Sequence, residues 1–130
     1  MLKDLDTYKI PIKIGNEDLY LLYNLNAKLC MEYMTGEKYE DILSKDNWST
    51  DEILIFLKAM LIDNYYEENK DYISKRKFEL CRPALSELGR LINEIDIENI
   101  ILNIISCIAE SMPKAPIDET GNFQKAVQKK

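Results

Sequence analysis

The residues of this chain whose types could do chemistry are carboxylates and thiols, because the sequence contains no histidine. The lack of histidine excludes Ser-His-Asp and Cys-His catalysis, histidine-ligated zinc and the commonest general base. Adjacent carboxylates on a helix point in different directions, so they do not converge on a substrate. This applies to the three adjacent pairs Glu40-Asp41, Asp51-Glu52 and Glu67-Glu68. We therefore expect no catalytic residue and no metal site, and we do not expect an enzyme.

The thiols are Cys30, Cys81 and Cys107, which lie far apart in the sequence. They form no C-x-x-C pair, so neither a thiolate metal cage nor a disulfide framework is indicated. We predict that all three are small buried apolar residues. The four glycines form no phosphate-binding cluster, and the sequence therefore predicts no nucleotide and no other cofactor.

The chain is acidic, with 17 Lys and Arg against 23 Asp and Glu in 130 residues and a net charge of −6. An acidic chain repels phosphate backbones, which argues against nucleic-acid binding. No apolar run reaches the ~20 residues that cross a bilayer, and the first residues lack the layout of a signal peptide. We therefore expect a cytoplasmic protein with no membrane contact, built as one domain.

The first predicted element is a β-hairpin over residues 8–24. Residues 8–14 alternate strictly between apolar and polar faces, Gly15-Asn16 is a turn pair, and residues 17–24 read as the return strand. Pro11 cannot donate to a ladder, so the first strand is predicted at a sheet edge. Lys9, Pro11 and Lys13 share the polar face, where they protect the edge from uncontrolled pairing and still permit a partner strand.

Helices are predicted to follow over residues 26–112. Residues 26–35 form a helix that stops at Gly36, and a short helical turn is expected at residues 39–44. Ser49 and Glu52 form a capping box at the start of a helix that is apolar all round, which indicates either the central core helix or a subunit interface. Residues 64–77 are polar and are interpreted as a helix end, a loop and a new start near Ser74.

The second half is predicted to contain two more helices. Pro83 suits the first turn of one, and Cys81, Leu85, Leu88, Ile92 and Ile95 make a narrow apolar seam along it. Asp96 is expected to cap a last, nearly all-apolar helix. Ile101 and Ile105 are predicted to lie in the core, so that an aspartate at either position would unfold the domain.

The predicted fold class is therefore α+β, mostly α: an N-terminal hairpin followed by a compact bundle of about five helices. Residues 1–7 are expected to be an arm, residues 8–112 the single domain, and residues 113–130 a flexible tail. Two sets of apolar residues are candidates for a groove that binds a partner helix. They are Ile53, Phe56, Leu57 and Met60 in the all-apolar helix, and Leu85, Leu88, Ile92 and Ile95 in the seam.

One stretch carries a family resemblance. Residues 24–36, NLNAKLCMEYMTG, resemble the "t-x-x-a-l-x-x-i-E-x-x-t-G" stretch of phage tail assembly chaperones. Residues 52–62 are similar to the apolar helix that follows in that family, and the order of elements resembles it over about residues 8–113. The acidic-Pro-Thr helix start that often comes next has no counterpart, since the sequence there reads Asp71-Tyr72-Ile73-Ser74.

The resemblance implies a protein of the host cytoplasm that is absent from the mature virion. Such proteins bind the tape-measure protein, recruit tail tube subunits and self-associate. Many also exist in a frameshifted longer form, and Lys129-Lys130 is compatible with a slippery sequence. The frequent Ile, Lys, Asn and Tyr indicate an A/T-rich genome, such as that of a low-GC bacterium or its phage. The alternative hypothesis is a small acidic regulatory or inhibitory protein that binds a basic partner.

Overall fold

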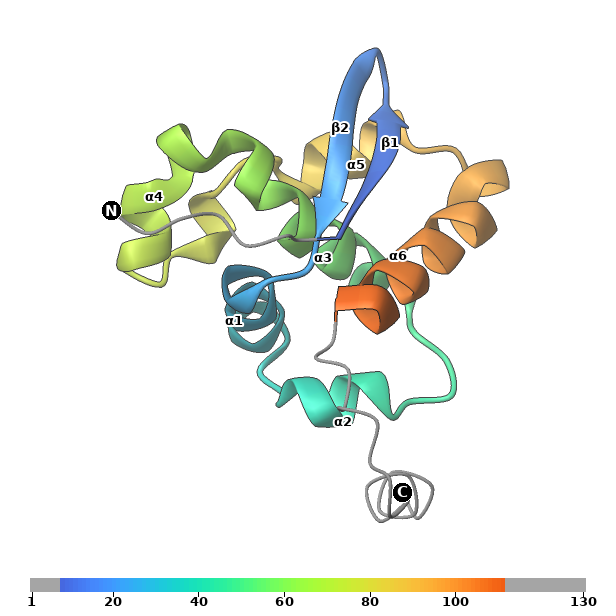
Figure 1. Ribbon diagram of the computed structural model, residues 1–130, viewed down its shortest axis with the longest axis horizontal. Coiled ribbons are helices and arrows are strands. Elements are labelled where there is room, and N and C mark those ends of the chain that lie inside the picture. The colour runs from blue at the N-terminus through green and yellow to red at the C-terminus, as the bar shows by residue number, and fades with distance from the viewer. Residues whose placement is uncertain (1–7, 112–130) are drawn as a thin grey trace, which may run out of the picture.

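The hairpin opens the fold of this computed structural model, which describes residues 8–111. Strands β1 (Lys9–Ile14) and β2 (Glu17–Leu22) pair antiparallel, with Ile14 opposite Glu17 across a two-residue turn. Gly15 adopts a φ of 62°, which the tight turn requires and which glycine adopts without strain. The predicted hairpin is confirmed, and these two strands make up the sheet of the described chain (Figure 1).

Helix α1 (Leu25–Thr35) begins and ends where the sequence indicates. The Asn24 Oδ1 atom accepts a hydrogen bond of 2.9 Å from the backbone nitrogen of Ala27, which caps the first turn. Gly36 takes a left-handed φ of 75° and donates to the Glu32 carbonyl, which terminates the helix. The short helix α2 (Tyr39–Leu43) follows, as predicted.

Helix α3 (Thr50–Leu61) is the central element of the bundle. Its capping box is present in both directions between Ser49 and Glu52. The helix packs against α1, β2 and two later helices, and the residues from Ile55 to Leu61 are all buried. Of the two alternatives that the sequence leaves for this apolar helix, a core helix or a subunit interface, the structure supports the core helix.

The segment after α3 differs from the prediction. The 3₁₀ helix η1 (Ile62–Tyr65) leads into α4 (Tyr66–Ser74), so that helix occupies the stretch expected to be a loop. Two residues explain the difference: Ile73 and Asn69 are buried against the core, although polar residues surround both in the sequence. The helix ends at Ser74 rather than starting there, and the chain reverses through Arg76 at a φ of 59°.

The seam expected along one helix is broken in the structure. After η2 (Phe78–Leu80), the residues Cys81 and Pro83 lie in a bent connection before helix α5 (Leu85–Leu91). Ile92 is extended beyond that helix, with φ −101° and ψ 129°. Ile95 belongs to η3 (Glu94–Asp96) and is 87% exposed. The five residues of the predicted seam therefore lie in two helices and in the connections that flank α5, and the prediction of one helix is wrong.

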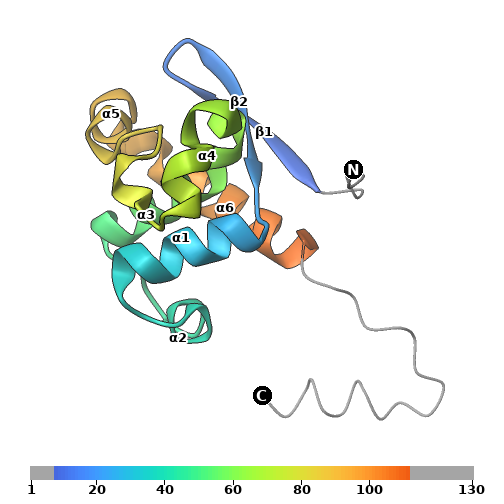
Figure 2. The same cartoon turned by 90° about the vertical axis from the view of Figure 1, so that its left-hand side faces the viewer.

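The last helix, α6 (Ile97–Ser111), is confirmed, but its predicted burial is not. Ile100, Ile104 and Cys107 face the core, whereas Ile101 is half-buried and Ile105 is 48% exposed. The placement of Ile101 and Ile105 in the core is a correction, because α6 covers the bundle from one side only (Figure 2).

The fold class is confirmed: an N-terminal hairpin stands on a mostly helical body, and the described elements share one hydrophobic cluster. The β2 strand contacts η1, and α6 contacts both strands, with β1 on the side nearer to α6 in Figure 1. The predicted arm at residues 1–7 and tail at residues 113–130 lie outside the described residues.

Candidate protein-binding surfaces

The predicted binding residues of α3 are not available at the surface. Phe56, Leu57 and Met60 have no exposed surface, and Ile53 is 5% exposed. In the seam, Leu88 is buried, Leu85 and Ile92 are half-buried against the core, and only Ile95 is open. The fold does not bring these eight residues together into a groove, because most of them form the core itself.

The three thiols, and the buried amine of Lys58 described below, are structural rather than reactive. Burial raises the pKa of Cys30 to about 12 and also raises the pKa of Cys81 and Cys107. A raised pKa keeps each sulfur protonated, and a thiol is a poor nucleophile. Within residues 8–111, no group of three or more acidic or cysteine residues could hold a metal ion.

Lys58 is the one charged side chain within the described core, and the sequence analysis missed it. Its Nζ atom donates to the carbonyls of Cys81 and Pro83, the latter at 2.8 Å, and burial lowers its pKa. A signal was present: Lys58 interrupts an otherwise apolar run between Leu57 and Ala59. The side chain holds the bent connection before α5, and it does not open onto a surface.

Two buried or half-buried asparagines also bond to backbone groups of distant segments. The Asn69 amide accepts from the backbone nitrogen of Arg82 and donates to its carbonyl, both at 2.8 Å. The Asn64 amide does the same for Tyr20 on β2, at 3.2 and 2.8 Å. Each amide thereby takes the place of a neighbouring strand for one residue.

The Asn64 contact also fixes which backbone groups of the hairpin face outward. The Tyr20 N–H and carbonyl both bond to Asn64, so they point away from β1. Tyr20 is opposite Pro11, and this pair is therefore a non-hydrogen-bonded pair of the ladder. By alternation, the backbone groups of Lys9 and Lys13 also point outward. Lys9, Pro11 and Lys13 all lie on β1, which pairs only with β2 within the described chain.

A polar groove of about 590 Å³ runs between this edge of β1 and the first half of α6. Pro11 and Lys13 line one wall, and Asp96, Asn99 and Asn103 line the other. Asn99 and Asn103 are one helical turn apart, which is the sequence signal for a polar stripe in an apolar helix. The sequence analysis did not use that signal.

A second hollow, of about 470 Å³ and mostly apolar, lies between α6 and the connection from α2 to α3. Trp48 forms its base: the indole Nε1 donates to the Ile42 carbonyl at 3.1 Å, and the ring meets Phe56 edge-on at 4.7 Å. Ile101, Ile105 and Ile108 of α6 complete the lining. The half-buried ring of Trp48 therefore both packs against the core and supplies surface to the hollow.

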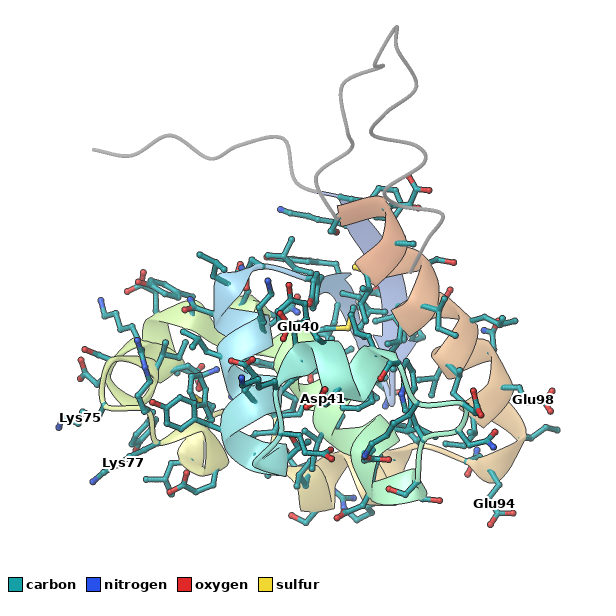
Figure 3. The ribbon with its side chains drawn as sticks, turned by 90° about the horizontal axis from the view of Figure 1, so that it is seen from below. Glu40, Asp41, Lys75, Lys77, Glu94 and Glu98 are labelled. Carbon is teal, nitrogen blue, oxygen red and sulfur yellow. The ribbon has the colours of Figure 1, made fainter. Side chains whose placement is uncertain are left out.

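Charge is distributed unevenly over the molecule. Figure 3 shows Lys75 and Lys77 at one end and Glu94 and Glu98 at the other, with Glu40 and Asp41 of α2 between them. Glu94, Asp96 and Glu98 make no salt bridge to another described residue. The three carboxylates at the start of α6 and in η3 are therefore not paired with a described cation, whereas Lys13 on the β1 wall of the groove pairs with Asp18 at 3.8 Å.

Comparisons with protein-family models, curated proteins and solved structures find no match to this chain. Within residues 8–111, none of the helices combines the length and the apolar character that crossing a bilayer requires. The surfaces themselves therefore carry the functional argument.

Proposed function

We propose that this chain is a phage tail assembly chaperone, which binds the tape-measure protein and recruits tail tube subunits without catalysing a reaction. The observation that carries the proposal is the apolar hollow beside α6. Ile105 lines this hollow and is 48% exposed. An exposed apolar hollow with an aromatic base is typical of a surface that receives an apolar helix face.

The chemistry of a tape-measure protein fits such a surface, because it is long, helical and partly apolar. A helix that places one aliphatic side chain between Trp48 and Ile105 would bury surface worth about 1.5–3 kcal/mol. The rim is polar and supplies specificity: Lys45 is held by Glu37 at 2.8 Å and by Glu52. The hairpin followed by the Asn24-capped helix that ends at Gly36 is consistent with the family resemblance.

The test is co-expression with the tape-measure protein encoded in the same genome, comparing three versions of this chain. Ile105→Asp places a charge in the hollow, and Leu102→Asp places the same charge on the same helix outside it. We expect the wild type and Leu102→Asp to keep the tape-measure protein soluble and bound. We expect Ile105→Asp to lose at least nine-tenths of the bound material. Equal behaviour of all three chains would refute the role of the hollow, and failure of the wild type would refute the function.

The alternative, a small acidic regulatory protein that binds a basic partner, is favoured by the uncompensated carboxylates near η3 and the net charge of −6. Salt separates the two functions. Binding through the apolar hollow is expected to change less than twofold between 0.05 and 0.5 M NaCl, whereas binding through the carboxylates is expected to weaken steeply.

A further inference from the structure

The outer edge of β1 presents a row of main-chain groups that no other residue within 8–111 bonds. The carbonyls of Lys9, Pro11 and Lys13 point outward, and so do the N–H groups of Lys9 and Lys13. An edge with unpaired donors and acceptors is a template for an added strand. Pro11 removes one donor from the middle of this edge, which weakens pairing without preventing it.

The facing wall of the groove carries groups suited to hold an extended chain from its other side. Asn103 is half-buried and Asn99 is exposed, and neither amide makes a hydrogen bond within residues 8–111. The same chain uses asparagine amides twice to bond both main-chain groups of one residue: Asn64 bonds Tyr20 in strand β2, and Asn69 bonds Arg82 in a bend. Asn99 and Asn103 face the edge of β1, and their amides could bond an extended chain in the same way.

The charged residues around the groove favour one kind of binding partner over another. Pairing of β1 with β1 of a second copy, centred on Pro11, would set Lys9 opposite Lys13, and like charges across a strand pair are destabilising. Asp96 lines the groove, Glu94 and Glu98 are its near neighbours in the sequence (Figure 3), and none of the three makes a salt bridge to a described residue. A chain with a net charge of −6 also attracts cations over a longer range.

We propose that the groove between β1 and α6 binds an extended, lysine- or arginine-bearing segment of another protein, which adds to β1 as a third strand. The main chain of the segment bonds to the open edge and to the asparagine amides. A basic side chain of the segment meets the carboxylates around Asp96. This site is separate from the apolar hollow, and it does not depend on the role in tail assembly.

The probe is a soluble pool of capped octapeptides, randomised over every amino acid except Cys and Pro, passed over the immobilised full chain. We expect retained peptides to be enriched at least threefold in Lys and Arg over Asp and Glu. Resynthesis of the best retained peptide with N-methyl groups on alternate residues should weaken its binding at least tenfold, because N-methylation removes the main-chain donors. Retention without basic enrichment, or equal binding after methylation, would overturn the proposal.

Protein variants locate the binding. Asn99→Trp fills the groove from an exposed position, and Leu102→Trp places the same ring on the same helix outside it. We expect peptide retention to be lost in the first variant and kept in the second. Pro11→Val restores the missing donor, and one net hydrogen bond corresponds to about fivefold tighter binding of the same peptide. A wild-type chain that retains no more peptide than Asn99→Trp would also overturn the proposal.

Discussion

The outer edge of β2 lies beside η1, whereas Pro11 and Lys13 of β1 line a polar groove. The two edges differ because side chains from η1 bond to β2, and not because the sequences of the two strands differ. Asn64 bonds both main-chain groups of Tyr20, and the Tyr65 hydroxyl donates to Glu17 at 2.9 Å. No residue does this for Lys9 or Lys13 within the described chain. One edge therefore contributes to folding stability, and the other is left for binding.

The largest expected effect on stability comes from removing the Asn64 contact to the outer edge of β2. Asn64→Leu leaves the Tyr20 N–H and carbonyl without partners, and it also removes the bond from Asn64 to the Leu61 carbonyl at 3.1 Å. An unsatisfied buried main-chain group costs about 1–3 kcal/mol, and these groups are part-buried, so we expect a loss of about 3 kcal/mol in the free energy of unfolding. Urea denaturation measures it.

The matched control for that variant is on the open side. Asn99→Leu makes the same substitution in the facing wall of the groove, where the amide bonds to no described residue. A surface substitution of this kind changes stability by about 0.5 kcal/mol or less. Equal losses in the two variants would contradict the distinction between the edges.

A smaller effect is expected from Tyr65→Phe, which removes the hydroxyl contact to Glu17 on β2. Burial first, and then the hydrogen bond to Glu17, raise the pKa of Tyr65 to about 12 from its ordinary value of 10.0. A raised folded-state pKa means that the contribution is fully present below pH 10 and is lost as the pH rises through 12. We expect the variant to be about 0.5–1 kcal/mol less stable at pH 8.

The alkaline range gives this prediction a spectroscopic readout. The difference in phenolate absorbance between wild type and Tyr65→Phe should titrate near pH 12 rather than near pH 10. A midpoint near 10 would show that the hydroxyl is free, and that η1 does not hold the start of β2 through this contact.

The sequence predicts one of these edges and not the other. Alternation over residues 8–14, the Gly15-Asn16 turn and Pro11 are local signals that predict the hairpin, which the structure confirms, and its open edge. The closure by Asn64 depends on residues 44 positions apart in the sequence, and no local pattern encodes it. Local signals likewise fix the two ends of α1 and the start of α3.

The candidate surfaces were predicted less well, for a reason that concerns α3 and α6. Apolar spacing on a helix identifies which residues avoid water, but it does not say whether a core or a partner covers them. Phe56 and Met60 prove to be core, and Ile105 proves to be surface, although all three belong to similar apolar patterns. The seam through Leu88 and Ile95 shows that such spacing can also run across a break between elements.

Amide hydrogen exchange compares the outer edges of β1 and β2 in the unmodified chain. We expect the Tyr20 N–H to be protected by its bond to Asn64, and the Lys13 N–H to exchange at close to the rate of an unstructured peptide. In Asn64→Leu the protection of Tyr20 should fall toward that of Lys13. Protection of Lys13 in the isolated chain would mean that another part of the same molecule already occupies the β1 edge.

The smallest expected effect on stability is that of Pro11→Val. The valine suits a strand better, but the loss of proline frees the unfolded chain, and the two changes of about 0.4–1 kcal/mol oppose each other. We therefore expect the free energy of unfolding to stay within about 0.5 kcal/mol of the wild type, with the new Val N–H exchanging as fast as that of Lys13. Pro11 lies opposite Tyr20 in a non-hydrogen-bonded pair, so the added N–H has no partner on β2. A gain of more than 1 kcal/mol that grows with protein concentration would show that the restored donor pairs two copies of the chain, and that Pro11 keeps the open edge from closing on itself.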